Sequence, residues 1–295
     1  MGGGNGGIRR WRLGDGQEVG NQSGMELRAI CVSKDQKWIV CGAEKGVSVW
    51  DGEMNEKVID VQGTNGVWAV DVSPDSTRFA TGTRAKEASV WSLTSGERLV
   101  GPLQHDDYVN GVRFSPTGEH IATACRGDSI SIFDSQTGSQ LVCIKTDIPI
   151  WLGTPLAWSN DAQQIFTASR ENKIRSFDVA TGSQLAESQI LDGEGFHSIA
   201  LATNGKFIAA FTRQSISFMD TSTLARIYLV TEHSNQTRSI SISPDNSYFA
   251  AGQYDGKILV RDLSKILPNS YGPFQASISA LIVLGCQKGP IHHLH

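Results

Sequence analysis

Histidine and cysteine are the residue types through which this chain could catalyse a reaction or hold a metal ion. Histidines lie at positions 105, 120, 197 and 233 and in the C-terminal segment "HHLH" (292–295), and five cysteines are spread along the chain. No Cys-x-x-Cys, His-Glu-x-x-His, Gly-x-Ser-x-Gly or P-loop stretch occurs. The internal histidines have no acidic neighbour at a fixed spacing. We therefore expect no catalytic residues, no metal and no cofactor, and interpret "HHLH" as a solvated end rather than a weak metal site.

Composition narrows the classes of function further. The sequence is 39% hydrophobic and 19% charged, which is typical of a soluble globular protein. A net charge of −4 provides no general attraction to nucleic acid or to an anionic membrane. No apolar run reaches the roughly 18 residues that a membrane span needs. The N-terminus has no secretory signal and the cysteine count is odd, so we predict free thiols and a location in the cytoplasm or the nucleus.

The chain repeats itself with a period near 42 residues. The segments "FDSQTGSQL" (133–141) and "FDVATGSQL" (177–185) are nearly identical, and a turn-like stretch such as "VSPDS" (72–76) recurs in six places. A bulky residue that ends an alternating run recurs at intervals of 39 to 44 residues, at Trp11, Trp50, Trp91, Phe133, Phe177, Met219 and Arg261. Two independent markers with one period predict a repeat architecture.

Each period contains four short stretches with the alternation of β-strands. In one repeat these include "NGVRFS", "HIATAC" and "SISIF", separated by Pro, Asp and Gly turns. A lone four-stranded sheet cannot bury both faces, whereas neighbouring sheets packed in a closed ring can.

The repeats resemble the WD40 family, in which the third strand ends in Trp-Asp and the period is about 40–45 residues. Here the dipeptide is Trp50-Asp51, with related pairs Phe133-Asp134, Phe177-Asp178, Met219-Asp220 and Arg261-Asp262. The resemblance implies an all-β propeller of four-stranded antiparallel blades. It also implies a stabilising network of a His, an Asp and the Trp, for which His105, His233 and Asp255 occupy matching positions. No repeat keeps all three members.

Seven third-strand landmarks predict seven blades in a single domain over residues 1–295. The repeats are expected around 24–57, 66–100, 105–143, 150–187, 195–227 and 233–265, and the closing blade is expected from 5–20 together with 274–286. The segment 274–286 contains no turn signal and could give one long strand. An incompletely closed ring, or a chain cut from a longer protein, is the alternative.

An arginine recurs in the turn between the second and third strands. Arg84, Arg126 and Arg170 each stand seven residues before their landmark, and Arg213 stands six before. Arginine presents a planar fork of donors to carboxylate or phosphate, so this arginine arc could dock an acidic or phosphorylated segment. The alternative is a solvated position inherited by duplication, with Arg126 and Arg170 neutralised by Asp128 and Glu171.

A second set of candidate binding residues lies at the start of each first strand. Its members are Arg28, Trp68, Asn110, Thr154, His197 and Arg238, with Tyr108 and Trp151 close by in sequence. The resemblance implies that they lie near the mouth of the central channel. Aromatic residues and arginine are typical anchors of interfaces, although each aromatic residue alone is more often core packing.

These features predict a non-catalytic scaffold, monomeric by itself, that binds other proteins on the loop-bearing face of the propeller. The alternative function is binding of RNA or single-stranded nucleic acid through the arginine arc, with aromatic rings to stack on the bases. The negative net charge favours protein partners.

Overall fold

The computed structural model describes residues 7–11, 17–23, 27–53, 56–127, 129–146, 156–168, 171–190, 196–212, 215–231, 237–253, 258–272, 281–282 and 291–293. These residues form β-strands and two short 3₁₀ helices, η1 (Leu263–Lys265) and η2 (Asn269–Tyr271), and include no α-helix. None of their helices is long and apolar enough to cross a membrane. The chain divides into a first unit, residues 27–170 and 176–185, and a second unit, residues 1–26, 171–175 and 186–295.

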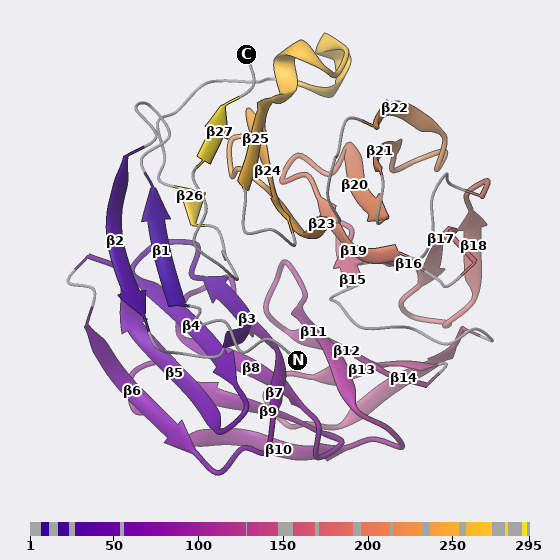
Figure 1. Cartoon of the computed structure of the whole chain (residues 1–295). Coiled ribbons are helices and arrows are strands. Elements are labelled where there is room, and N and C mark those ends of the chain that lie inside the picture. The colour runs from indigo at the N-terminus through magenta and orange to yellow at the C-terminus, as the bar shows by residue number, and fades with distance from the viewer. Residues whose placement is uncertain are drawn as a thin grey trace. The chain divides into compact units, whose positions relative to one another are not determined.

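Three four-stranded antiparallel sheets lie within the first unit, each a meander in chain order (Figure 1). Their strands are β3 (Leu27–Val32), β4 (Trp38–Ala43), β5 (Gly46–Asp51), β6 (Lys57–Gln62), β7 (Val67–Val72), β8 (Arg78–Thr83), β9 (Glu87–Ser92), β10 (Arg98–Gln104), β11 (Val109–Phe114), β12 (His120–Cys125), β13 (Ser129–Asp134) and β14 (Gln140–Lys145). The first strands of the three sheets, β3, β7 and β11, lie side by side. A fourth sheet in the same order consists of β15 (Leu156–Trp158), β16 (Gln164–Ala168), β17 (Ile174–Asp178) and β18 (Gln184–Glu187).

The second unit holds two more four-stranded sheets and one three-stranded sheet. The strands of the first are β19 (Phe196–Leu201), β20 (Phe207–Thr212), β21 (Ile216–Asp220) and β22 (Arg226–Val230). Those of the next are β23 (Thr237–Ile242), β24 (Tyr248–Gln253), β25 (Ile258–Asp262) and, parallel to β25, β27 (Ile291–His293). The three-stranded sheet places β1 (Gly7–Trp11) between β2 (Glu18–Ser23) and β26 (Leu281–Ile282), which lies beside β1 in Figure 1.

The prediction of seven four-stranded blades is wrong for the described residues, which form six four-stranded sheets. The reason lies in the turn after β25. After β13 and β17 the chain turns through Thr-Gly into a fourth strand, but Asp262 is followed by Leu-Ser-Lys and caps η1 by accepting from the Ser264 N–H. The fourth strand of that sheet therefore comes from residues 291–293, in the segment that we had interpreted as a solvated end. Of the expected closing segment the structure describes Leu281 and Ile282, and both pair with β1.

The aspartates that follow Phe133 and Phe177 explain why the chain repeats nine residues almost unchanged. Asp134 Oδ1 accepts from the Thr137 N–H at 2.7 Å and from the Thr137 hydroxyl at 2.9 Å, and Asp178 does the same with Thr181. Gly138 closes the turn at φ +73°, in the left-handed region that glycine tolerates. These hydrogen bonds lower the pKa of Asp134 and Asp178 and direct the chain into the fourth strand.

The landmarks, except the half-buried Arg261, are core residues. Trp11, Trp50, Trp91, Phe133 and Phe177 are all buried. The Trp91 indole N–H donates to Thr81 at 2.9 Å, and the His105 ring contacts the Thr123 hydroxyl at 2.7 Å and the edge of Phe133. Burial lowers the pKa of His105. A threonine at the fourth position of the second strand thus completes the polar contacts where the sequence lacks the aspartate of the family network. His233 and Asp255 lie outside the described residues.

Candidate functional site

The predicted first-strand positions share one backbone feature. In β7, Val67 pairs with Thr83 and Ala69 with Gly82, so Trp68 has no residue opposite and forms a β-bulge. The same bulge occurs in each of the other first strands where the position is described, at Arg28, Asn110, His197 and Arg238. A bulge redirects the side chain of its extra residue, and bulges are frequent beside binding sites.

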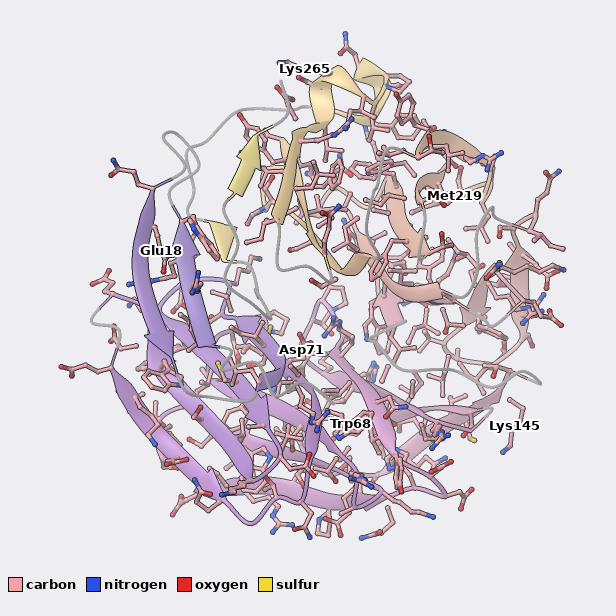
Figure 2. All side chains as sticks on the ribbon, in the orientation of Figure 1. Glu18, Trp68, Asp71, Lys145, Met219 and Lys265 are labelled. Atoms are coloured by element: carbon pink, nitrogen blue, oxygen red, sulfur yellow. The ribbon has the colours of Figure 1, made fainter. Side chains whose placement is uncertain are left out.

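Trp68 is the centre of a set of ring contacts in the first unit. Figure 2 labels Trp68 near the start of β7, three residues before Asp71. The Arg28 guanidinium carbon lies 5.3 Å from the centroid of the Trp68 ring, and the Tyr108 ring is 6.5 Å from the same ring. The indole nitrogen of Trp68 is buried and has no hydrogen-bond partner among the residues that the structure describes. The first-strand position thus brings residues of three sheets together.

Two arginines of the predicted arc make cation–π contacts with the same ring, that of Tyr108. The guanidinium carbon of Arg84 lies 5.7 Å from the ring centroid and that of Arg126 lies 6.0 Å from it. Both arginine side chains are exposed. Each such cation–π contact is worth about 0.5–1 kcal/mol at an exposed site.

Glu44 is the member of this surface that the sequence did not reveal. Its carboxylate lies 3.1 Å from Arg28 Nε and 3.7 Å from Arg84 Nη1. Glu44 stands six residues before Trp50, in the turn where other repeats carry the arginine, so extending the repeat register to this sheet would have placed it here. We call Arg28, Glu44, Trp68, Arg84, Tyr108 and Arg126 the Tyr108 cluster.

Backbone hydrogen bonds hold these turns in place. The Gly66 N–H donates to the Glu44 carbonyl and the Arg84 N–H to the Gly66 carbonyl, both at 2.9 Å. The Arg126 N–H donates to the Tyr108 carbonyl at 2.8 Å. Gly66 has φ +63°, and a Cβ there would lie 3.1 Å from Arg84 Cβ, so the position requires glycine. The cluster therefore stands on a fixed backbone.

The remaining predicted site residues are not placed in this cluster. Arg170, Arg213, Trp151 and Thr154 lie outside the described residues, and of His197 and Arg238 only the strand positions are described. Asn110 follows Tyr108 by two residues and is 2% exposed, and within the described part of the chain neither of its amide atoms is hydrogen-bonded.

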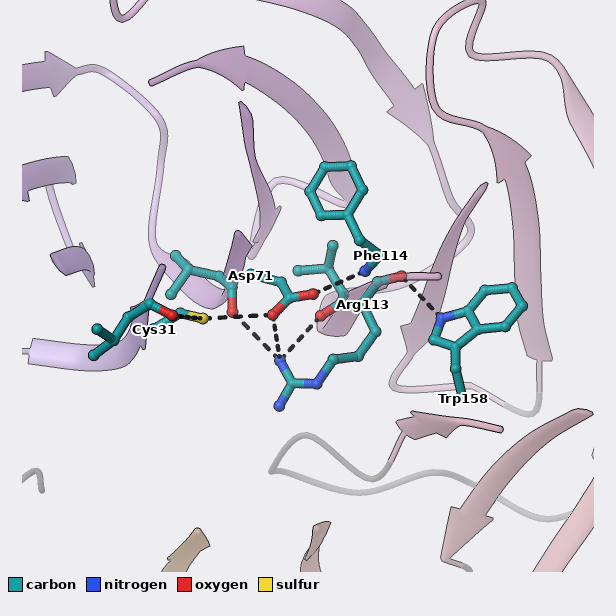
Figure 3. A network of polar contacts seen from close by, with 8 residues as sticks. Cys31, Asp71, Arg113, Phe114 and Trp158 are labelled. Carbon is teal, nitrogen blue, oxygen red and sulfur yellow. Dashed lines mark hydrogen bonds and ion pairs between the residues drawn. The ribbon is translucent and has the colours of Figure 1, made fainter. Parts of the chain in front are cut away.

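A second polar group links β3, β7 and β11 three residues further along (Figure 3). Asp71 accepts from the Phe114 N–H at 2.8 Å, and Arg113 Nη1 and the Cys31 thiol each lie 3.5 Å from its other oxygen. Arg113 Nη1 also reaches the Val112 carbonyl at 3.3 Å, and the Arg113 carbonyl accepts from the Trp158 indole at 3.1 Å. We call Cys31, Asp71, Arg113 and Phe114 the Asp71 network.

Burial controls the protonation of the Asp71 network. Burial raises the pKa of Asp71, against the opposing effects of the Arg113 charge and the Phe114 N–H. Burial, and then the Asp71 charge, raise the pKa of the Cys31 thiol to about 12. A thiol with this pKa is not a nucleophile near neutral pH, so the group has the character of a structural contact between strands.

The chemistry available to the Tyr108 cluster is recognition. It offers guanidinium groups, aromatic faces and an unused indole N–H, and it contains no nucleophile beside a base. Among the described residues no group of three or more His, Cys, Asp or Glu side chains could hold a metal ion.

Four-stranded meanders with their first strands side by side define a repeat protein of the β-propeller class. The family model "WD domain, G-beta repeat" matches residues 17–51, 56–92, 98–134 and 224–262, which together make up half of the chain. The chain therefore belongs to the WD40 repeat family, as the repeat period and the Trp50-Asp51 pair predicted.

Similarity to curated relatives covers part of the chain. It is 30% identical over 140 residues to the small ribosomal subunit protein RACK1 of Caenorhabditis elegans, covering 44% of this chain and 42% of that protein. It is 33% identical over 135 residues to RACK1 of Drosophila melanogaster (42% and 41%). It is 29% identical over 108 residues to the protein groucho of Drosophila melanogaster (35% and 14%). The chain thus matches less than half the length of each relative.

Proposed function

We propose that this protein is a non-catalytic interaction scaffold that binds partner proteins through the Tyr108 cluster. The observation that carries the proposal is the set of contacts joining Trp68, Tyr108 and three arginines on one surface of the first unit. Tryptophan, tyrosine and arginine are the residues most enriched among the energetically dominant contacts of protein interfaces. We propose that Arg170, Arg213, Trp151, His197 and Arg238 also contribute to partner binding, each within its own repeat.

The construction of the surface suits this role. Arg28 and Trp68 are the bulged residues of β3 and β7, and Tyr108 directly precedes β11. Backbone hydrogen bonds fix the intervening turns. A preformed surface loses little conformational entropy on binding, so more of the contact energy appears as affinity.

Protein partners fit the electrostatics better than nucleic acid does. Glu44 already neutralises part of the charge of Arg28 and Arg84, which lowers the positive potential that a nucleic acid would need. We also propose that the protein acts in the cytoplasm, as a monomer. Cys31, Cys41, Cys125 and Cys143 are free thiols, the state expected in a reducing compartment.

The test is affinity capture from a cell lysate with the wild type and a Trp68→Ala/Tyr108→Ala variant, both shown to be folded by circular dichroism. We expect the variant to lose a defined set of proteins. The matched control is Leu99→Ala/Leu141→Ala, which removes two apolar side chains that are 51% and 50% exposed on the outer strands β10 and β14. The control should capture the same proteins as the wild type.

Two results would contradict the proposal. One is equal capture by the wild type and the Trp68→Ala/Tyr108→Ala variant. The other is capture that disappears after nuclease treatment and falls steeply with salt, which would indicate nucleic-acid binding instead. Because two relatives are named small ribosomal subunit proteins, sedimentation with ribosomes is one direct assay to include.

A further inference from the structure

The Tyr108 cluster contains more arginine side chains than carboxylates. Arg28 and Arg84 share the single carboxylate of Glu44. Arg126 is exposed, lies over the Tyr108 ring, and has no carboxylate partner among the described residues. One half of the cluster therefore already holds a carboxylate, and the other half presents a guanidinium without one.

The unused hydrogen-bonding groups around Tyr108 are largely donors. The Trp68 indole N–H is buried without an acceptor on one side of Tyr108, and the Arg126 fork of N–H groups lies on the Tyr108 ring itself. The amide of Asn110, on the same end of β11, is also unpaired. The indole N–H and the Asn110 amide are both buried, so the accessible unused donors are those of the exposed Arg126 guanidinium. A ligand for Arg126 must bring acceptors and a negative charge.

We propose that the Arg126 half of the cluster binds an extended acidic segment of a partner protein. An Asp or Glu carboxylate of that segment pairs with the exposed Arg126 guanidinium beside the Tyr108 ring. This inference rests on the proposed function and names the chemistry of the partner. A single uncompensated guanidinium matches one carboxylate, whereas a phosphoryl group carries about −1.5 to −2 and would remain partly uncompensated.

The experiment is selection of random linear peptides from a display library against the full-length wild type and against Arg126→Gln. We expect the wild type to enrich peptides with Asp or Glu at one fixed position. The best peptide, made with a fluorescent label, should bind Arg126→Gln about tenfold to a hundredfold more weakly, the value of a charge-assisted hydrogen bond. Changing its acidic residue to the amide should cost the same factor, and combining both changes should cost no more than either alone.

Arg98→Gln is the matched control, since Arg98 is also an exposed arginine that lies over an aromatic ring, 5.2 Å from the centroid of Trp91. It should bind the peptide like the wild type. Arg126→Lys keeps the charge without the planar fork and should bind at an intermediate strength.

Four outcomes would overturn the inference: no acidic preference, equal losses in Arg98→Gln and Arg126→Gln, tighter binding when phosphoserine replaces the acidic residue, or no enriched peptide at all. Peptides that depend on Trp68 and Tyr108 but not on Arg126 would overturn the inference while supporting the proposed function. Where no peptide is enriched, the lysate capture decides the proposed function separately.

Discussion

The second and the fifth residues of β3, β7 and β11 use their polar groups in opposite ways. The second residues of β3, β7 and β11 are Arg28, Trp68 and Asn110, and the fifth residues are Cys31, Asp71 and Arg113. At the fifth position the polar groups satisfy one another across the strands. At the second position an indole N–H and an amide remain unpaired.

This difference separates stability from recognition. A polar group that is paired within the fold contributes to stability and offers nothing to a partner, whereas an unpaired one costs stability until a partner arrives. Substitutions at the fifth position should therefore change the free energy of unfolding, and substitutions at the second position and its surroundings should change binding.

The largest effect is expected at Asp71. Asp71→Ala removes the acceptor of the Phe114 N–H and the carboxylate that pairs with the Arg113 guanidinium, at a cost of about 3 kcal/mol in the free energy of unfolding. Urea unfolding followed by circular dichroism measures this cost. The control is Asp60→Ala, which removes an exposed carboxylate paired with Lys57 and should cost less than about 1 kcal/mol. Equal costs would show that the Asp71 network is not a stabilising element.

The repeat period predicts most of the fold but gives no sign of the Asp71 network. Turns and landmarks recur because each sheet needs the same hydrogen-bonded turns. The period therefore predicts the order of the strands in each sheet. Cys31, Asp71 and Arg113 occupy one register position but differ in type, so no recurring residue marks them. Their interaction depends on β3, β7 and β11 lying side by side, which only coordinates show.

The candidate site was partly predictable for a related reason. The arginines and the first-strand residues were found because they hold fixed places in the repeat. Glu44 was missed because it differs from the arginine expected in that turn, although the repeat register predicts that turn to lie beside the others. The unpaired state of Trp68 and Asn110 is a matter of distances and has no signal in the sequence.

Asn110 tests the comparison in the opposite direction, with a substitution that should increase stability. Asn110→Leu replaces a buried, unpaired amide by an apolar side chain of similar size at a position without positive φ, so it should raise the free energy of unfolding by about 1–2 kcal/mol. Thermal unfolding measures the gain. A loss of stability would mean that the Asn110 amide is satisfied in solution.

Asn246 is the matched control for that substitution. Its Oδ1 accepts from the Thr203 N–H at 2.8 Å, and its φ is +58°, so Asn246→Leu should lower stability on both counts. Opposite signs for two buried asparagines would show that pairing and backbone conformation, rather than residue type, decide the outcome.

Asp220 in the second unit tests whether a partly exposed but fully paired carboxylate behaves like Asp71. Burial raises the pKa of Asp220, but hydrogen bonds from Ser222, Thr223 and Tyr271 outweigh it and lower the pKa to about 2. A lowered pKa contributes stability above the usual value of 3.8 that is lost as pH falls through about 2. Tyr271→Phe removes the 3.0 Å hydrogen bond from the hydroxyl and should cost about 1 kcal/mol at neutral pH.

The pH dependence separates this effect from a general loss of packing. The stability difference between the wild type and Tyr271→Phe should shrink as Asp220 is protonated below pH 3.8 and vanish below about pH 2. Tyr248→Phe, which removes a hydroxyl without a hydrogen-bond partner among the described residues, should show little difference at either pH. A difference in Tyr271→Phe that persists at low pH would assign its cost to packing against Phe207 instead.

The smallest effect on stability is expected at Arg126, and it makes the sharpest comparison because Arg113 can receive the same substitution. Arg126→Gln removes an exposed cation–π contact at 6.0 Å and should change the free energy of unfolding by about 0.5 kcal/mol or less. Arg113→Gln removes the counter-charge of the largely buried Asp71 and should cost about 2 kcal/mol. If peptide binding falls only in Arg126→Gln and stability falls only in Arg113→Gln, Arg126 acts in recognition and Arg113 in stability. Equal stability losses would mean instead that the Tyr108 cluster is also part of what holds the first unit together.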